Sequence, residues 1–141
     1  MIQDIFPHVY HNAFQKCEAQ PQDMLLAYRG NAVLSAPEEF RLPRCGDLPD
    51  MPVRYAFSID DTRYFLAKKA PEEQTAWRLL PSAEYRYALP RETAFACAVG
   101  ETLHRWYCSN RFCGACGAEM ADSAAERALC CPKCGAVVYP R

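Results

Sequence analysis

Two short cysteine motifs near the C-terminal end of the chain carry its clearest chemistry. Residues 113–117 (Cys-Gly-Ala-Cys-Gly) and 131–135 (Cys-Pro-Lys-Cys-Gly) share the pattern C-x-x-C-G. The two-residue gap lets a tight turn direct both sulfurs at one ion, and the following glycine can take the backbone conformation that brings amide hydrogens towards the thiolates. The 14 residues between Cys116 and Cys131 suffice for a strand, a loop and a returning strand. Together they predict a tetrahedral zinc ribbon with four ligands: Cys113, Cys116, Cys131 and Cys134.

Other uses of these cysteines stay open at this point. Disulfides cannot use all nine cysteines of the chain, because nine is odd. A redox-active C-x-x-C pair, an iron–sulfur cluster or another soft metal would use the same residues. Cys130 competes with Cys131 as a ligand, and Cys131 is preferred because only it keeps the two-residue turn. The other cysteines have no partner at ligand spacing and are expected to be free thiols: Cys17, Cys45, Cys97 and Cys108.

Four thiolates fill the coordination sphere of zinc, so the metal is predicted to be structural rather than catalytic. Its binding energy then folds a module too small to have a core of its own. The sequence contains no nucleophile elbow, Walker loop or Rossmann fingerprint. The pair His8-x-x-His11 could chelate a metal in principle, but no carboxylate or cysteine accompanies it. We therefore expect no catalytic residue among these 141 residues.

The residues before the cysteine motifs predict a small sheet. Apolar residues 24–28 and 32–34 flank Arg29-Gly30-Asn31 and are typical of a hairpin. Residues 53–59 and 62–67, separated by Asp60-Asp61, predict a second hairpin. Two further short strands are expected, at residues 40–42 and 77–80.

A helix is predicted from about residue 91 to 109. Pro90 suits the first turn, and Phe95, Val99, Leu103 and Trp106 recur at spacings of 4, 4 and 3. This stripe is expected to pack on the sheet. The predicted fold class is α+β: a small, mostly antiparallel sheet with a packing helix, followed by a zinc ribbon with four cysteine ligands. We expect the first domain to cover residues 1–110 and the ribbon residues 111–141.

The charge balance excludes strong nonspecific attraction to polyanions. Sixteen Lys and Arg residues against seventeen Asp and Glu give a formal net charge of −1, which leaves room only for a local basic patch. No apolar run approaches the roughly 18 residues of a membrane-spanning helix, and the first residues lack a signal-peptide pattern. We therefore expect no membrane association and a cytoplasmic location, where clustered cysteines more often bind metals than form disulfides.

Residues 103–117 (Leu-His-Arg-Trp-Tyr-Cys-Ser-Asn-Arg-Phe-Cys-Gly-Ala-Cys-Gly) resemble the linker helix and first zinc knuckle of the NADH pyrophosphatases, which are NAD(H) diphosphatases of the Nudix superfamily. Residues 138–141 (Val-Tyr-Pro-Arg) are similar to the family's segment just before its catalytic domain. Residues 40–44 resemble a Leu-Pro-basic step in its amino-terminal, Nudix-like domain. The resemblance is sharp from Leu103 onward and loose before it.

This resemblance implies a role in cleaving the NAD(H) pyrophosphate to AMP and nicotinamide mononucleotide, and in some members in removing NAD caps from RNA. It implies substrate contacts by Arg44, Glu126 and Tyr139, and a homodimer. Catalysis in the family depends on Mg²⁺ or Mn²⁺ held by the glutamates of a Nudix helix. The 141 residues contain no such signature, since the acidic pairs Glu38-Glu39 and Glu72-Glu73 lack its Arg-Glu core. We expect this chain to be the non-catalytic part of such an enzyme, inactive alone.

A second interpretation comes from a different class of protein. A free-standing zinc ribbon could bind nucleic acid or a protein partner. The run from Arg105 to Phe112 contains two arginines and three aromatic residues, which could stack on bases. The net charge of −1 argues against tight nonspecific binding.

Overall fold

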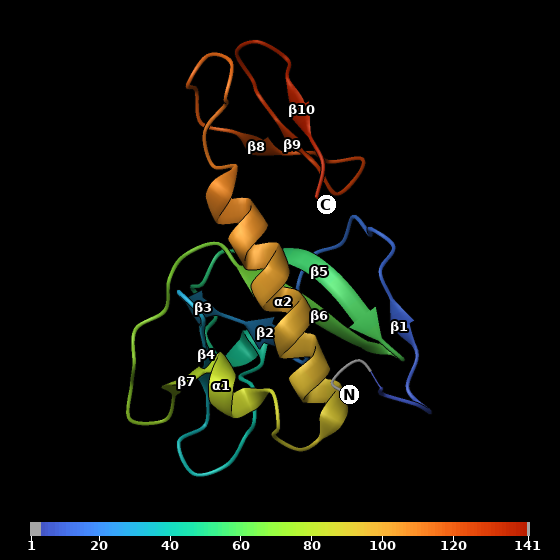
Figure 1. Ribbon diagram of the computed structural model, residues 1–141, viewed down its shortest axis with the longest axis vertical. Helices are drawn as coiled ribbons and strands as arrows, with labels where there is room; N and C mark the ends of the chain where they lie inside the picture. The colour runs from blue at the N-terminus through green and yellow to red at the C-terminus, as the bar shows by residue number, and fades with distance from the viewer. Residues whose placement is uncertain (1–3, 141) are drawn as a thin grey trace.

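The computed structural model describes residues 4–140. Residues 4–109 form a lower domain that ends in a long helix, and residues 110–140 form a small module at the end of that helix (Figure 1). The helices are η1 (Cys45–Asp47), α1 (Ser82–Tyr85) and α2 (Arg91–Ser109). The strands of the lower domain are β1 (Tyr10–His11), β2 (Met24–Leu26), β3 (Tyr28–Arg29), β4 (Ala32–Ser35), β5 (Val53–Ile59), β6 (Thr62–Ala67) and β7 (Arg78–Pro81). The strands of the module are β8 (Ala121–Asp122), β9 (Leu129–Cys130) and β10 (Val137–Val138). This architecture confirms the α+β class.

The largest sheet has the strand order β1-β5-β6-β2. Its centre is the antiparallel hairpin β5–β6, which confirms the second predicted hairpin. Asp60 in the connecting turn has φ of +53°, a conformation that aspartate tolerates better than most residues. Strand β2 pairs with β6 in parallel, so the sheet is mostly but not entirely antiparallel.

The first predicted hairpin is only partly right. Strands β3 and β4 do form a hairpin around Gly30, whose φ is +61°. Residues 24–28, however, divide between two sheets, because β2 joins β6 while β3 joins β4 and β7. The side chains of this run alternate between two apolar clusters, Leu26 and Tyr28 in one and Leu25 and Ala27 in the other. Both faces are therefore buried, which a single hairpin on one sheet would not achieve.

The strand predicted at residues 40–42 is wrong. Leu42 is buried, but the segment is a loop whose nearest ladder contact is an isolated bridge between Met24 and Arg44. The apolar pattern at residues 40–42 comes from Leu42, which is buried in a loop and does not pair with a strand. The strand predicted at 77–80 is observed one residue later, as β7.

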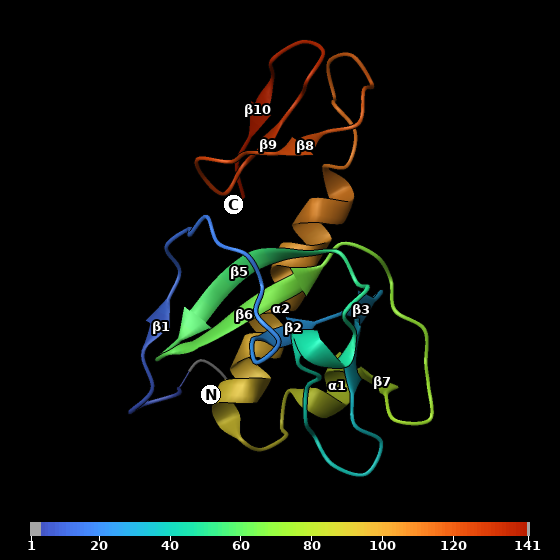
Figure 2. The same cartoon turned by 180° about the vertical axis from the view of Figure 1, so that it is seen from behind.

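Helix α2 spans the range that the sequence predicted and packs across one face of the large sheet (Figures 1 and 2). The predicted stripe is only partly right, since Leu103 is buried while Phe95, Val99 and Trp106 are half-buried. The fully buried face is built of smaller residues: Ala94, Ala96, Cys97 and Gly100. Gly100 is required there, because a Cβ at this position would lie 2.7 Å from Leu26 Cδ1 and closer still to Tyr28 Oη. Small residues thus let the helix approach the sheet, and the larger ones pack at its sides.

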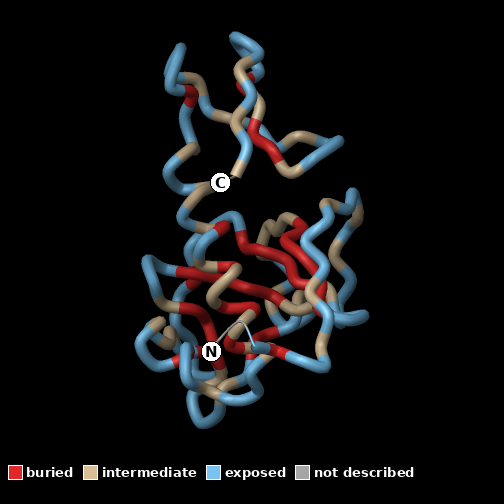
Figure 3. The backbone as a smooth tube through the Cα atoms, turned by 45° about the vertical axis from the view of Figure 1, so that its right-hand side comes forward, coloured by how far each residue is buried: buried red, intermediate tan, exposed pale blue. Residues whose placement is uncertain are grey.

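Burial is concentrated in the lower domain (Figure 3). Its main cluster lies between α2 and the large sheet and contains Phe57, which packs edge-on against Tyr10 and stacks on Tyr64. A partly buried ion pair joins Asp23, directly before β2, to Arg63 of β6, with two bonds of 3.1 and 2.7 Å from the Arg63 guanidinium to the Asp23 carboxylate. Within residues 4–140, no helix combines the length and the apolar character needed to cross a bilayer.

Polar contacts attach the module to the lower domain. The Asp122 carboxylate accepts from Arg54 and Lys68, each at 3.3 Å. The Arg127 guanidinium donates to Asn12 Oδ1 at 2.6 Å and to the carbonyl oxygen of Ala56. These contacts set how the module lies against the end of the sheet.

Candidate metal centre

The two C-x-x-C-G motifs form two knuckles of the same backbone design. In the first, the Cys113 amide donates to the Ala118 carbonyl at 2.7 Å, and the Gly117 amide donates to the Cys113 carbonyl at 2.8 Å. The second repeats this pattern, from Cys131 to Ala136 at 2.8 Å and from Gly135 to Cys131 at 3.0 Å. Both glycines have a positive φ, 79° and 80°, in which a Cβ would be strained. The repeated spacing therefore produces one turn twice.

Backbone amides point at the first sulfur of each knuckle, as the sequence predicted. The Ala115 amide donates to Cys113 Sγ at 3.4 Å, and the Cys134 amide donates to Cys131 Sγ at 3.4 Å. These amide dipoles favour thiolates, the form that binds a metal.

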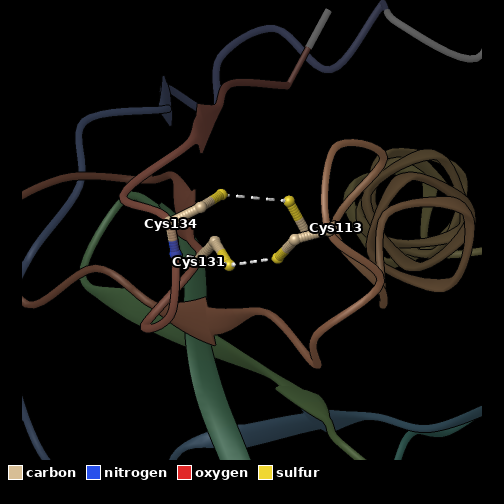
Figure 4. Close-up of side chains that lie close together, drawn as sticks. Cys113, Cys131 and Cys134 are labelled. Carbon is tan, nitrogen blue, oxygen red and sulfur yellow. Dashed lines mark hydrogen bonds between the residues drawn. The ribbon is translucent and has the colours of Figure 1, made fainter.

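The four predicted ligands converge on one point. The sulfurs of Cys113, Cys116, Cys131 and Cys134 all lie within 4.8 Å of one another. Across the gap between the knuckles, the Sγ atoms of Cys113 and Cys134 are 3.6 Å apart and those of Cys116 and Cys131 are 3.4 Å apart (Figure 4). A zinc tetrahedron with Zn–S near ~2.3 Å has edges of about 3.8 Å, so the cluster fits this ion with small adjustments.

The geometry also bears on the alternatives. A disulfide needs about 2.05 Å between sulfurs, and all nine cysteines are free. Cys130 lies in the middle strand of the module and is not one of the four clustered cysteines. Among the other free thiols, Cys97 is fully buried, and burial raises its pKa. Cys108 is exposed, with its sulfur 3.5 Å from His104 Nε2.

Hydrogen bonds divide the four thiols into two kinds. The pKa of Cys113 is lowered, chiefly by the amides of Cys116 and Ala115, and that of Cys131 is lowered, chiefly by the amide of Cys134. At Cys116 and Cys134 a backbone amide also lowers the pKa, but neighbouring sulfurs outweigh it and raise the pKa. Zinc binds all four cysteines as thiolates, and its positive charge offsets the repulsion among these closely spaced negative sulfurs.

Two of the predicted substrate contacts lie together. Tyr139 Oη donates to Glu126 Oε1 at 2.8 Å, and both side chains are exposed. This bond raises the pKa of the Tyr139 phenol. Arg44, the third, lies in the other domain directly before η1, where its backbone amide donates to Asp47 Oδ2 at 2.8 Å. Glu126 and Tyr139 therefore lie together in the module, whereas Arg44 lies in the lower domain.

The two N-terminal histidines do not form a shared site. His8 Nδ1 pairs with Asp60 Oδ2 at 2.7 Å, and His8 Nε2 lies 3.5 Å from Glu92 Oε2. His11 belongs to β1 and pairs with Ser58 of β5. The two histidines therefore have separate surroundings.

The polar contacts of Asp122 and Arg127 that attach the module were missed by the sequence reasoning. The Arg127 partner Ala56 is 71 residues away, and no local pattern marks such a contact.

Comparison with known proteins places the C-terminal segment. Residues 109–139 match the family model of the NADH pyrophosphatase zinc ribbon domain. The chain is 37% identical over 71 residues to the NAD-capped RNA hydrolase NudC of Chromobacterium violaceum, covering 50% of this chain and 26% of that protein. It is 53% identical over 36 residues to the protein of the same name from Stutzerimonas stutzeri, covering 26% of this chain and 13% of that protein.

A third such protein, from Deinococcus radiodurans, is 54% identical over 33 residues, covering 23% of this chain and 12% of that protein. The matched regions thus span about a quarter or less of the length of these relatives. The match and the cysteine geometry agree with each other. The C-terminal segment of this chain, residues 109–139, is therefore a zinc ribbon of the NADH pyrophosphatase type.

Proposed function

We propose that this chain is the amino-terminal and zinc-ribbon portion of an NAD(H) pyrophosphatase, which hydrolyses the dinucleotide pyrophosphate to AMP and NMN(H). One observation carries the proposal: four sulfurs within 4.8 Å of one another, in a segment that matches the zinc ribbon of these enzymes. In this proposal the zinc is structural. Four thiolates leave no coordination position for substrate, so the ion holds the ribbon in shape.

The ribbon presents substrate contacts to a neighbouring catalytic domain. Tyr139 offers an aromatic ring suited to stacking on the adenine end of the dinucleotide. Its bond of 2.8 Å to Glu126 supports this role, because it holds the two exposed side chains next to each other. Arg44 is proposed as a separate contact to the phosphates, from the lower domain.

Hydrolysis itself needs residues that these 141 do not contain. Mg²⁺ or Mn²⁺, bound by a Nudix helix in a catalytic domain, would activate the attacking water. We propose a cytoplasmic homodimer in which this part contributes to dimerisation. The relatives are named NAD-capped RNA hydrolases, so NAD-capped RNA is proposed as a substrate beside NAD(H).

The test compares the purified 141-residue chain with the native gene product, captured from its own cells by an antibody against the ribbon. We expect the chain to bind one zinc ion and to release no AMP from NADH, and the native product to release AMP when Mg²⁺ or Mn²⁺ is added. Hydrolysis by the 141-residue chain, or its absence from the native product, would contradict the proposal.

A further inference from the structure

A cleft of about 830 Å³ opens where the zinc ribbon meets the lower domain, and the function proposed above gives it no role. Its walls come from the β3–β4 turn, the two ends of the β5–β6 hairpin, the last turns of α2 and the ribbon. Five cationic side chains line it: Arg29, Arg54, Lys68, Lys69 and Arg111. Two carboxylates, Glu119 and Asp122, also line it, which leaves a net charge of +3 in a chain whose net charge is −1. The cleft is therefore the local basic patch that the overall composition conceals.

The carboxylates neutralise only part of this charge. Asp122 lies between two cations, Arg54 and Lys68, so that group keeps one positive charge. Arg111 lies 3.9 Å from Glu119, at the limit of an ion pair. Within residues 4–140, no carboxylate lies at ion-pair distance from Arg29 or Lys69, and both are exposed. These two cations are available to a ligand without breaking an existing pair.

Arg54 is the fixed point of the cleft. Its guanidinium carbon lies 3.8 Å from the centroid of the Tyr107 ring, and the side chain is only 19% exposed. Its Nε is buried and has no hydrogen-bond partner among the described residues. The Tyr107 ring and the ion pair with Asp122 therefore hold the Arg54 guanidinium at the wall of the cleft, where it contributes positive charge to a bound phosphate rather than a donor from its buried Nε.

The cations are spread along the cleft rather than gathered at one point. They come from four separate parts of the fold, which suits an extended chain of phosphates better than a single phosphate. The cleft also adjoins a smaller cavity of about 170 Å³ lined by Glu126, and the two share Arg54, Lys68, Tyr107 and Asp122 as walls. Glu126 is a proposed contact of the dinucleotide, so the cleft lies beside the position proposed for the cap.

We infer that this cleft binds the phosphodiester backbone of single-stranded RNA, the part of a capped RNA that follows the dinucleotide. The inference rests on the proposed function for its choice of ligand. The binding itself needs only this chain. It uses phosphate contacts without reading bases, so it is independent of sequence and sensitive to salt.

The experiment measures fluorescence anisotropy of a labelled single-stranded RNA of about 12 nucleotides on the zinc-loaded chain, between about 50 and 200 mM salt. The variant R29E/K69E reverses the two unpaired cations. We expect it to weaken binding at least about tenfold, since two attractive phosphate contacts become repulsive. The control R78E/R91E makes the same change of charge at exposed positions outside the cleft, and we expect it to bind within about twofold of the parent chain.

A milder variant guards against loss of folding. R29Q/K69Q removes the charges without reversing them, and we expect the slope of log affinity against log salt to become shallower by about 1.4. Zinc content and thermal melting of all variants should equal those of the parent.

Three outcomes would overturn the inference. The first is that the chain binds no RNA at the lowest salt. The second is that R29E/K69E and the control R78E/R91E lose RNA affinity equally. The third is competition by an acidic peptide as effective as RNA of equal charge, because the cleft would then be a protein-binding site. None of these outcomes depends on NADH hydrolysis, so the proposed function stands or falls separately.

Discussion

The lower domain and the zinc ribbon are held together by different forces. Within residues 4–140, the lower domain with α2 supplies 22 of the 26 buried apolar residues, and the ribbon supplies four. Two of those four are the metal-site cysteines Cys113 and Cys131, and the others are Ala128 and Leu129. The ribbon thus has almost no apolar core, whereas the lower domain has two clusters. The contrast is visible in Figure 3, where buried backbone is sparse in the upper module.

This difference teaches how a short segment acquires a fixed shape. About 30 residues cannot bury enough apolar surface to offset the entropy of ordering their backbone. Four metal–sulfur bonds replace that core at one point, and two knuckles of the same design position the sulfurs. The lower domain needs no metal because its hairpins and helix bury aromatic and aliphatic side chains against one another.

Removing the zinc should have the largest effect, and it should affect the ribbon alone. Cys131→Ser deletes a ligand, and we expect loss of zinc and unfolding of the ribbon, since structural zinc contributes about 10 kcal/mol or more in small zinc modules. Residues 4–109 should keep their amide exchange protection because their core contains no ligand. Zinc content by mass spectrometry and hydrogen exchange measure both results. The matched control is Cys130→Ser, which should retain one zinc. Full zinc content in Cys131→Ser would mean that Cys130 replaces it or that the site is wrongly assigned.

A substitution in the apolar core should destabilise the lower domain and leave the zinc site intact. Phe57→Ala empties a fully buried position between Tyr10 and Tyr64, and we expect a loss of about 3–5 kcal/mol in the unfolding free energy of the lower domain. Zinc content should not change. The control is Phe112→Ala in the ribbon, where the side chain is 58% exposed and the expected change is within about 0.5 kcal/mol. Equal effects of the two substitutions in chemical denaturation would show that the two regions unfold as one.

The contact between the two regions should be of intermediate strength. Arg127→Ala removes the donors to Asn12 and Ala56, and we expect the attachment of the ribbon to weaken by about 1–2 kcal/mol while both regions stay folded. Residual dipolar couplings measure this, because one alignment should fit both regions in the parent chain and fail in the variant. Arg105→Ala is the control, since its 71% exposed side chain makes a helix-surface pair with Glu101. A single alignment that still fits Arg127→Ala would show that other contacts hold the ribbon.

The smallest expected effect concerns pH and the lower domain alone. A hydrogen bond to Asp60 raises the pKa of His8 above 6.5, and the same bond lowers the pKa of Asp60 below 3.8. The contribution of His8 to folding stability is fully present below pH 6.5 and is lost as pH rises through the folded-state pKa of His8. The Asp60 contribution is present above pH 3.8 and is lost as pH falls through its folded-state pKa.

The pair should therefore stabilise most between these limits, and His8→Ala should reduce the melting temperature slightly near about pH 5.5 and not at about pH 8. His11→Ala is the control, because it removes a histidine and leaves the His8–Asp60 bond in place. A constant difference between His8→Ala and the parent chain across this range would contradict the pairing. Both exposed partners are screened by solvent, which keeps the effect small.

The sequence alone predicted the features that depend on local spacing. The four clustered cysteines, the hairpin β5–β6 and the span of α2 follow from motif spacing, turn residues and helical periodicity within short windows. Each knuckle is a local turn, so Gly117 and Gly135 take the backbone conformation that their position after the second cysteine indicates.

The tertiary structure decided whatever depends on partners far apart in the chain. Periodicity located α2 but not its buried face, because the need for a glycine at Gly100 comes from Leu26 of β2 and Tyr28 of β3, which are far away in the sequence. The division of residues 24–28 between two sheets was set by two clusters that form only when β6 and β7 are in place. The basic cleft likewise unites cations from Arg29 to Arg111, and a net charge summed along the sequence cannot show where the fold places them.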